Sequence, residues 1–435
     1  MSHKKARLLI NYKATSTYAL NVILGALECA RDSNQIDISL VPRASDLGEA
    51  IRESLREFER VLVAWSFYSP EFAQMSLELR KVKALVSDPR LLHIAGGVHA
   101  TAQPEQTLRA GFDIVAIGEG EKTIAELAPR LVTGEDLTQS RGIGYLADGR
   151  FTSNGTGELI DLDDFPPYAP QHKRFNPIEI TRGCIYACRF CQTPFMFKAR
   201  FRHRTIKNIC HYVQTMKDHG LTEVRFITPT SLSYGSTDES VNMAAVEELL
   251  SSVRSIIGSN GRIFFGTFPS EVRPEHVTPG ALLTLKKYVN NDNLVIGGQS
   301  GSLRVLDSSH RGHDVDCIVD AVGYSLAAGF LPNVDFIFGL PGETPEDIRA
   351  SLDLAERLAG MGARIHGHTF MPLPGTPFQL APPGAIPGWA MHRLKRLESR
   401  GRLYGQWKQQ VSIAKSLATS RTYRGKYEQK TLLVT

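Results

Sequence analysis

The sequence has 435 residues, of which 42% are hydrophobic and 22% are charged, and its formal net charge is +5. Such a composition is typical of a folded globular protein, and the length predicts more than one domain. The modest positive charge permits an anionic substrate, but we expect no nucleic-acid partner. Six cysteines in so long a chain do not make a disulfide framework, and no apolar run is long enough for a signal peptide or a membrane span. We therefore expect a cytoplasmic protein.

The first third of the chain alternates short apolar runs with amphipathic patterns. Strands are predicted at residues 6–12, 36–42, 61–69, 91–97 and 113–120. Helices are predicted between and after them, at residues 18–32, 47–60, 70–86, 104–111 and 121–134. This alternation predicts an α/β fold with a doubly wound, Rossmann-like parallel sheet, whose ligands bind beyond the carboxyl ends of the strands.

A segment rich in Gly, Asp and Pro, residues 142–170, interrupts this alternation and predicts a hairpin followed by a linker. Strands then alternate with helices again, which predicts a partial (β/α)6 barrel of the TIM type with its site at the carboxyl ends of the strands. The predicted barrel strands are 178–183, 223–229, 262–268, 293–299, 333–342 and 364–375. The predicted domains are residues 1–165, 166–380 and 381–435, and the last is a basic helical extension.

The segment TRGCIYACRFCQTP, residues 181–194, places Cys184, Cys188 and Cys191 in the loop after the first barrel strand. Three interpretations are open. A structural zinc site takes four ligands and would need His203 as the fourth. Inert buried thiols are the second option, although the loop is polar. The third is a four-iron cluster on three thiolates, which leaves one iron without a protein ligand.

The spacing of these cysteines, with Phe190 directly before the last of them, resembles the signature of the radical S-adenosylmethionine (SAM) superfamily. The resemblance implies a 4Fe–4S cluster held by Cys184, Cys188 and Cys191 and shielded by Phe190. It also implies that SAM binds the open iron and is cleaved to a 5′-deoxyadenosyl radical.

Two later segments resemble SAM-binding strands of that superfamily. Residues 296–306 resemble the fourth-strand segment, which implies that Gln299 and Ser300 contact the ribose or carboxylate of SAM. Residues 334–347, which include Gly339, resemble the fifth-strand motif that brackets the adenine.

The second barrel strand departs from the superfamily pattern. Many members carry Gly-Gly-Glu there, which binds the SAM amino group, whereas this chain has TPTSLSYG. Thr228, Thr230 or Ser231 would then supply the oxygens for that amino group. Residues 201–209 resemble the segment after the cluster loop in the B12-binding and methylthio-transferring subgroups.

Residues 95–108 and 113–127 resemble the cobalamin (B12)-binding subgroup, in which a doubly wound domain precedes the barrel. The resemblance implies that the strand ends cradle the nucleotide tail of the corrin. Small residues there, Ser66, Gly96 and Gly97, would let the tail pass close to the backbone.

Several candidate contacts in this first domain are less specific. Gly118 and Glu119 belong to a lone Gly-x-Gly, and His99 is either a hydrogen-bonded loop residue or a cofactor contact. The Asp-x-His-x-x-Gly motif that ligates cobalt in many cobalamin domains does not occur. Cobalamin then binds without a protein imidazole, or another residue such as Tyr68 lies beneath the corrin, or the domain has lost cobalamin.

The remaining cysteines and two histidines have no metal-site spacing. Cys29, Cys210 and Cys317 fall in helical patterns, as core or surface residues, and they do not form a second cysteine triad. His310 and His313 belong to a loop that precedes a helix after the fourth barrel strand. Sulfur-inserting members usually carry a second cluster, so this composition argues against sulfur insertion.

The combined resemblance implies a cobalamin-dependent radical SAM enzyme. We expect a methyltransferase that moves a methyl group from methylcobalamin to an unactivated carbon of a small molecule or biosynthetic intermediate. An external electron donor of the flavodoxin or ferredoxin type would supply electrons. The alternatives are another radical reaction, such as a cyclisation or ring rearrangement, and a nonenzymatic iron–sulfur or corrinoid-binding protein. No acid or base is assigned, and Tyr234 and Glu271 are candidates by residue type alone.

Overall fold

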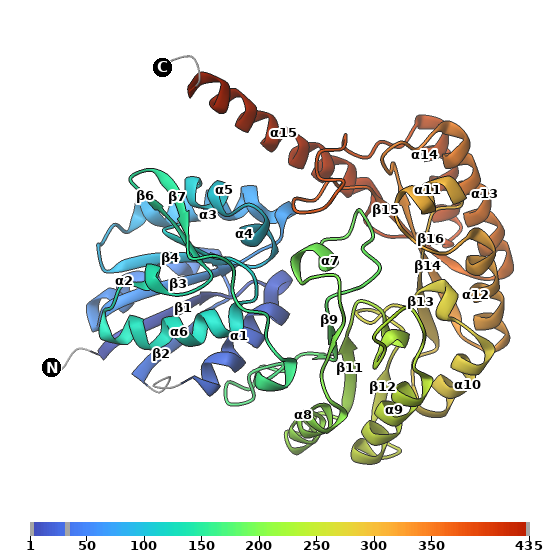
Figure 1. Ribbon diagram of the computed structural model, residues 1–435, viewed down its shortest axis with the longest axis horizontal. Coiled ribbons are helices and arrows are strands. Elements are labelled where there is room, and N and C mark those ends of the chain that lie inside the picture. Colours follow the sequence, from blue (N-terminus) through green and yellow to red (C-terminus); the bar gives the residue numbers. More distant parts are fainter. Residues whose placement is uncertain (1–3, 31–34, 432–435) are drawn as a thin grey trace. The chain divides into compact units, whose positions relative to one another are not determined.

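The computed structural model describes residues 4–30 and 35–431. The chain divides into two compact units, residues 1–178 and 179–435, and both are drawn in Figure 1. The domain limits at residues 165 and 380 stay predictions. None of the described helices combines the length and the apolar character needed to cross a membrane.

The first unit contains a seven-stranded sheet in the order β2-β1-β3-β4-β5-β6-β7. Its strands are β1 (Lys4–Asn11), β2 (Ile36–Val41), β3 (Phe58–Ser66), β4 (Leu91–Gly96), β5 (Ile114–Ala116), β6 (Ile143–Ala147) and β7 (Arg150–Ser153). Its helices are α1 (Thr17–Cys29), α2 (Leu47–Glu57), α3 (Phe72–Leu85), α4 (Val98–Ala102), α5 (Pro104–Arg109) and α6 (Gly120–Thr133). The first five strands are parallel, and β6 and β7 add antiparallel strands at one edge.

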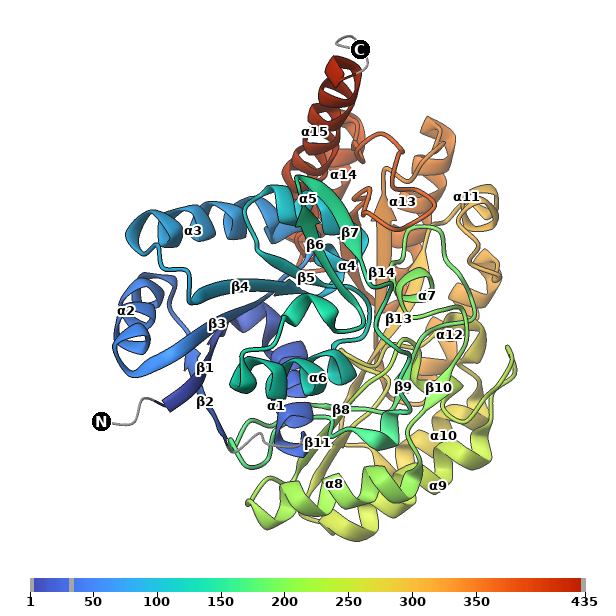
Figure 2. The ribbon, with the colours of Figure 1, turned by 60° about the vertical axis from the view of Figure 1, so that its left-hand side comes forward.

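Apolar side chains on both faces of the parallel strands explain why this sheet is covered on both sides. In β1, Leu8 and Ile10 pack in the core on one face of the sheet, and Leu9 packs in the core on the other. Helices α1 and α6 cover one face of the sheet, and α2, α3 and α5 cover the other (Figure 2). The predicted doubly wound, Rossmann-like fold of this unit is confirmed.

The element limits differ from the prediction at several places, and three of these differences concern the sheet. Residues 58–60, predicted as helix, belong to β3, because Phe58 is buried in the core and pairs with Lys4 of β1. The strand predicted at 113–120 ends at Ala116, shortly before Gly118 turns the backbone to a φ of +94°. The predicted hairpin forms, but it extends the sheet by pairing with β5. The end of the helix predicted at 18–32 falls on residues 31 and 32, which lie outside the described residues.

The barrel strands of the second unit follow one another in chain order, in two sheets of order β12-β11-β8 and β13-β14-β15-β16, and β9 and β10 form a separate antiparallel pair. Its strands are β8 (Ile178–Glu179), β9 (Thr181–Arg182), β10 (Arg202–His203), β11 (Glu223–Ile227), β12 (Arg262–Phe264), β13 (Asn293–Gln299), β14 (Leu331–Phe338), β15 (Arg364–Thr369) and β16 (Leu403–Tyr404). A single parallel bridge between Val272 and Ile296 links the segment after β12 to β13. The six predicted barrel strands are therefore present.

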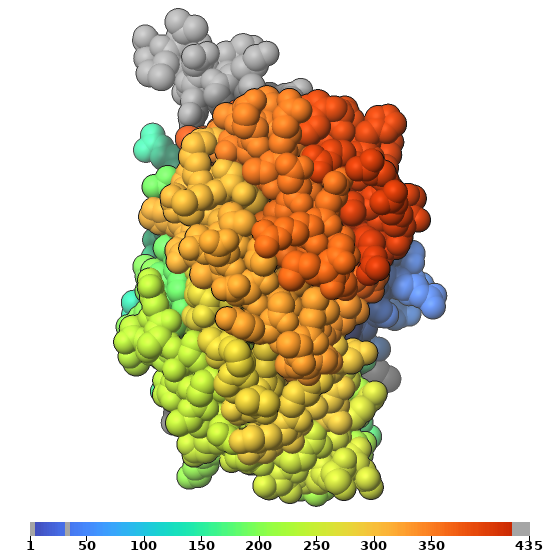
Figure 3. Space-filling view, turned by 90° about the vertical axis from the view of Figure 1, so that its right-hand side faces the viewer, coloured from blue at the N-terminus to red at the C-terminus, as the bar shows by residue number. Residues whose placement is uncertain are grey.

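Helices alternate with these strands along the chain. They are α7 (Thr193–Met196), α8 (Ile206–Asp218), α9 (Met243–Ile257), α10 (Pro279–Tyr288), α11 (Leu303–Ser308), α12 (Val315–Ala327), α13 (Pro345–Met361), α14 (Gly388–Ser399) and α15 (Trp407–Thr431). The later ones, yellow to red in Figure 3, form a continuous outer surface. The start of α13 shows why they begin where they do: Thr344 Oγ1 accepts the Asp347 N–H (3.3 Å) while Asp347 accepts the Thr344 N–H (2.8 Å).

The region after Trp389 is not one helical extension. A short strand, β16, separates α14 from α15 and pairs in parallel with β15. Leu403 of β16 and Trp407 of α15 are buried in the core beneath α13. This part of the predicted extension is therefore an integral layer of the second unit.

Candidate functional site

The three clustered cysteines lie in a loop that follows β9 and is held by hydrogen bonds from two other segments. The Arg189 N–H donates to the Ser309 carbonyl (3.1 Å), after α11. The Phe378 N–H donates to the Arg189 carbonyl (3.3 Å), and Gln192 Nε2 donates to the Pro374 carbonyl (2.7 Å), both after β15. Segments that follow two barrel strands therefore fix the position of the loop.

The cysteine thiols are unbridged and interact electrostatically with one another. Burial raises the pKa of the Cys184 thiol to about 12; a hydrogen bond from the Tyr186 backbone opposes the rise, and the neighbouring Cys188 and Cys191 add to it. Burial also raises the pKa of Cys191. Crowded thiols of this kind ionise when a metal compensates their charge, so the donor set fits a bound metal cluster.

Two buried arginines stand beside this loop. Arg311 Nη1 lies 3.3 Å from Cys188 Sγ as a hydrogen-bond donor. Arg273 lies with its guanidinium 3.5 Å from the centre of the Tyr186 ring, and it donates to the Arg311 carbonyl and to Glu275. Buried positive charge favours the thiolate form of the cysteines.

These arginines were not singled out from the sequence. His310 and His313 do lie in the predicted loop, between α11 and α12, and the arginine between them is the functional neighbour of the cysteines. Burial works against ionisation of Glu275, but contact with His313 and the charge of Arg273 lower the pKa of Glu275 to about 2. In the sequence, the position of Arg311 between two histidines of one loop is the feature that could have indicated it.

The zinc interpretation of the cysteines lacks its fourth ligand. His203 Nδ1 lies 2.9 Å from Thr181 Oγ1, and His203 Nε2 lies 2.7 Å from the Ser236 carbonyl, so both ring nitrogens have partners. Phe190, between Cys188 and Cys191, packs on a small apolar group that includes Leu340. Its shielding of a cluster stays a prediction.

Gln299 has the backbone conformation expected of a ligand-contacting residue. It is buried at the end of β13 with a φ of +74°, where the register between β13 and β14 shifts. A left-handed backbone at a non-glycine residue is strained and concentrates at functional sites. Ser300, by contrast, has structural partners: its Oγ lies 3.1 Å from Ser351 Oγ and accepts the Ser302 N–H (3.2 Å). Contacts of Gln299 and Ser300 with SAM stay predictions.

Gly339 terminates β14 at a position that only glycine fits. Its φ is +78°, and a side-chain carbon there would lie 2.6 Å from the Ala385 backbone nitrogen. The Gly339 N–H donates to Glu343 Oε2 (2.7 Å), and burial raises the pKa of Glu343 to about 7. The segment resembling an adenine-bracketing motif is thus rigidly packed, while its contact with adenine stays a prediction.

The segment after β11 presents buried hydroxyls. Thr228 Oγ1 donates to the Thr230 carbonyl (3.1 Å) and so has a partner. Thr230 Oγ1 and Ser231 Oγ are buried, and neither has a hydrogen-bond partner among the described residues. Buried polar groups are almost always paired, so such orphaned oxygens indicate a position for a ligand.

Replacing Thr230 with valine should weaken SAM binding by about tenfold, roughly 1.4 kcal/mol, because it removes the predicted acceptor for the SAM amino group while nearly conserving side-chain size. The ligand-free protein should not lose stability, since the substitution removes an unpaired buried hydroxyl. Equilibrium dialysis with SAM and thermal melting check both parts. Ser325→Ala is the control, because the Ser325 hydroxyl donates to the Ala321 carbonyl (2.6 Å) within α12. Equal SAM affinity in wild type and Thr230→Val would contradict the assignment.

In the first unit, the predicted cobalamin contacts gather at one edge of the sheet. Ser66 ends β3, Gly96 ends β4, and Gly118 follows β5, which are neighbouring parallel strands. Gly97 has a φ of +88°, and a side-chain carbon there would lie 3.0 Å from Ser66 Oγ. This edge is where doubly wound folds bind ligands.

His99 is buried next to this edge. Its Nδ1 lies 3.1 Å from Ser69 Oγ, and its ring stacks on Phe72 with centroids 4.2 Å apart. Burial lowers the pKa of His99 to about 4, so the ring is neutral. Nε2 has no partner within the described part of the chain. A contact with a cofactor stays a prediction.

Glu119 and Tyr68 differ in their surroundings. Glu119 is buried, and its Oε2 accepts the Ile160 N–H (3.0 Å), which ties the segment after the hairpin to the unit. Tyr68 is 46% exposed, and its partial desolvation together with the charge of Glu71 raises its pKa. The structure thus gives Glu119 a structural role and leaves Tyr68 accessible.

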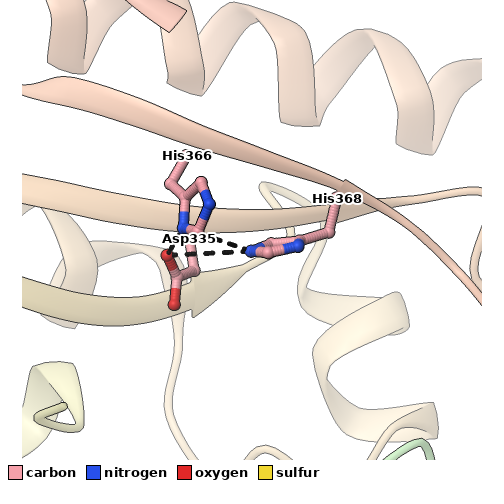
Figure 4. A group of neighbouring side chains, drawn as sticks. All are labelled: Asp335, His366 and His368. Carbon is pink, nitrogen blue, oxygen red and sulfur yellow. Dashed lines mark hydrogen bonds and ion pairs between the residues drawn. The ribbon is translucent and has the colours of Figure 1, made fainter. Parts of the chain in front are cut away.

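A polar group that the sequence analysis missed lies inside the second unit. Asp335, His366 and His368 place their side chains toward one another from β14 and β15 (Figure 4). Burial raises the pKa of Glu271 to about 7; a hydrogen bond with its own backbone lowers that pKa, and the nearby Asp335 raises it further. Tyr234 instead donates its hydroxyl to the Arg204 carbonyl (2.8 Å). In the sequence, the His-x-His spacing of His366 and His368 on a predicted strand could have indicated this polar group.

Comparison with protein families identifies both units. Residues 178–355 match the model of the radical SAM superfamily, and this region contains the three clustered cysteines. Residues 178–355 therefore form a radical SAM domain. Residues 12–128 match the B12 binding domain. Radical SAM membership implies a 4Fe–4S cluster and SAM, and the B12-binding domain implies cobalamin, so the predicted family and cofactors are confirmed.

Curated relatives of this chain carry different names. "Uncharacterized methyltransferase PH0819" of Pyrococcus horikoshii is 25% identical over 279 residues, which cover 61% of this chain and 58% of the relative. A tRNA-2-methylthio-N(6)-dimethylallyladenosine synthase of Moorella thermoacetica is 31% identical over 227 residues, which cover 51% of this chain and 48% of the relative. The matched region thus spans only about half of each relative.

Two solved radical SAM structures share the fold. TsrM of Kitasatospora setae, a methyltransferase with cobalamin and a 4Fe–4S cluster bound, aligns with a TM-score of 0.67 at 17% identity over 87% of this chain and 77% of TsrM. The cobalamin-dependent enzyme OxsB aligns with a TM-score of 0.64 at 14% identity over 94% of this chain and 56% of OxsB. At these identities the likeness concerns the two-domain fold, and it confirms the predicted fold class.

Proposed function

We propose that this protein is a cobalamin-dependent radical SAM methyltransferase that methylates an unactivated carbon of a small molecule. The observation that carries the proposal is the presence, in one chain, of a three-thiol loop and a B12-binding domain. When bound, the cluster supplies the electron that cleaves SAM and cobalamin supplies the methyl group.

The residues of the second unit have separate tasks in this proposal. Cys184, Cys188 and Cys191 hold three irons and leave the fourth for SAM. Arg311 compensates the negative charge of the thiolates from 3.3 Å. The unpaired hydroxyls of Thr230 and Ser231 accept hydrogen bonds from the SAM amino group. These side chains orient SAM without supplying an acid or a base.

Methylthio transfer is the second candidate, because curated relatives carry that name. The three cysteines outside the loop argue against a second cluster: Cys29, Cys210 and Cys317 lie on three different helices, α1, α8 and α12. We therefore propose methyl transfer without sulfur insertion.

The test uses the full-length protein, loaded anaerobically with iron, sulfide and hydroxocobalamin and incubated with SAM and a strong reductant. Candidate small molecules are screened as substrates with methyl-deuterated SAM. The proposal expects S-adenosylhomocysteine and 5′-deoxyadenosine in comparable amounts, together with a product that contains the labelled methyl group. Release of 5′-deoxyadenosine with no S-adenosylhomocysteine would instead indicate another radical reaction. Formation of neither compound would indicate a nonenzymatic binding protein.

A further inference from the structure

Three side chains of types that commonly bind metals, Asp335, His366 and His368, meet on the inner side of the strands of the second unit (Figure 4). His366 and His368 are two positions apart on β15 and therefore point to the same side. Asp335 lies opposite His366 in the parallel register of β14 and β15. The alternate β14 residues Val334 and Phe336 pack in the core beneath α13, on the other side.

The distances among the three groups suit a single cation. His366 Nδ1 lies 2.9 Å from Asp335 Oδ1 and 3.3 Å from His368 Nε2, and His368 Nε2 lies 4.0 Å from Asp335 Oδ1. Metal–ligand bonds of about 2.0–2.1 Å in tetrahedral geometry place ligand atoms about 3.3 Å apart. Two imidazoles with one carboxylate form a donor set that zinc and iron(II) prefer over magnesium or calcium.

Neighbouring residues fix the orientation of both rings. The Tyr404 ring stacks on His366 with centroids 4.5 Å apart and an interplanar angle of 8°. The Thr369 N–H donates to Gln410 Oε1 (2.8 Å), so the Gln410 amide nitrogen faces His368 Nδ1 at 3.3 Å. Packing and contacts outside the group therefore hold both rings. The Gln410 amide holds His368 Nδ1 as an acceptor, so a metal at Nε2 would have to displace that contact and leave the proton on Nδ1.

We propose that Asp335, His366 and His368 bind one divalent transition cation of the zinc type, at a site separate from the cysteine loop. Three protein ligands leave at least one coordination position open, as in catalytic rather than structural zinc sites. An oxygen or nitrogen donor of the substrate is the ligand that fits this position.

The surroundings place this cation next to the segment to which we assign SAM binding. The Ser231 N–H donates to the Glu271 carbonyl (2.9 Å), and the Glu271 side chain interacts electrostatically with Asp335 and His366. The cation would thus hold and polarise a substrate close to SAM. The role of the cation in holding the substrate rests on the proposed methyl transfer. Binding of the cation to Asp335, His366 and His368 does not depend on that reaction.

The test measures zinc binding by the full-length protein after its iron–sulfur cluster has been reconstituted and loosely bound metal has been removed with a chelator. Calorimetry and metal analysis should give about one zinc ion per chain with a dissociation constant of about 1 μM or tighter. Asp335→Asn and His366→Gln, checked by thermal melting, should each weaken zinc binding at least tenfold. Cys188→Ala should keep this zinc while it loses the cluster iron, which separates the two sites.

The zinc affinity of a Gln410→Glu variant distinguishes a metal site from a group of side chains that are only hydrogen-bonded to one another. A metal on His368 Nε2 requires a proton on Nδ1, and a carboxylate at position 410 can accept that proton and the Thr369 N–H together. Carboxylate–histidine–metal arrangements raise ligand basicity, so this variant should bind zinc about tenfold more tightly. If the group were only hydrogen-bonded, with His368 Nδ1 as an acceptor, the carboxylate would not improve zinc binding.

Three outcomes overturn the proposal: wild-type protein that binds no zinc, zinc binding that Asp335→Asn and His366→Gln leave unchanged, and a Gln410→Glu variant without any gain in affinity. Each is distinct from failure of the proposed function. A protein that forms S-adenosylhomocysteine and 5′-deoxyadenosine but binds no zinc would keep its methyl-transfer assignment and lose the metal site.

Discussion

Replacing Cys188 with alanine should leave the protein without its iron–sulfur cluster and unable to cleave SAM. Cys188 is the central cysteine of the loop, is buried, and lies within 3.3 Å of the Arg311 guanidinium. Two remaining thiolates cannot complete a three-thiolate cluster site, and the arginine then faces no anion. Iron analysis after anaerobic reconstitution should fall from about four irons per chain to near zero. Release of 5′-deoxyadenosine should fall below detection.

Cys210→Ala is the matched control. Cys210 lies on α8, outside the cysteine loop, and the sequence places no other cysteine near it at the spacing of a metal site. It should keep both iron and 5′-deoxyadenosine formation at wild-type levels. Full iron content in Cys188→Ala would remove the basis for the cluster assignment. Loss of iron in both variants would indicate a general failure of reconstitution, which a melting curve of each variant would reveal.

Local patterns carried most of what the sequence could predict. The strands of the first unit are buried on both faces, so their sequences are continuous apolar runs, and turns and helices punctuate them clearly. The cysteine spacing defines a chemical motif within one loop and needs no knowledge of the rest of the fold. For both reasons the doubly wound sheet, the barrel strands and the cluster cysteines could be predicted.

Features created by contacts between distant segments could not be predicted in the same way. Arg311 reaches Cys188 across 123 positions of sequence, and Asp335 meets His366 only because β14 and β15 pair in one register. Residues 58–60 continue a helical pattern, yet pairing of Phe58 with β1 makes them strand. Tertiary pairing decided these cases over local propensity.

Polar residues were hardest to interpret, because their partners determine their roles. Ser300 and Ser231 are both buried serines near strand ends, but Ser300 contacts Ser351 while the Ser231 hydroxyl has no partner among the described residues. The sequence alone gives no means to separate the two. Orphaned and satisfied hydroxyls become distinguishable only when the packing around them is known.

Gly96→Ala should abolish most cobalamin binding without harming the fold. Its backbone is ordinary strand, and an added side-chain carbon would meet only Ala116 Cβ at 3.8 Å and the Trp65 carbonyl at 3.9 Å, which are normal contacts. Alanine at a compatible glycine position stabilises by about 0.4–1 kcal/mol. If the corrin tail passes against this backbone, as the sequence resemblance implies, the methyl group occupies its path and affinity should fall at least about tenfold. Gel filtration with hydroxocobalamin, followed by absorbance, measures the retained corrin.

Gly323→Ala is the control for this variant, because Gly323 lies in α12 with open space around the position of an added carbon. Alanine also favours a helix over glycine there, so both variants should melt at or above the wild-type temperature. Only Gly96→Ala should lose the corrin. If both variants are equally stable, this difference shows that the added methyl group blocks cobalamin binding and does not disturb the fold. Retention of cobalamin by Gly96→Ala would place the corrin tail elsewhere along the sheet edge. Absence of cobalamin from the wild type would instead support the interpretation that this domain has lost its cofactor.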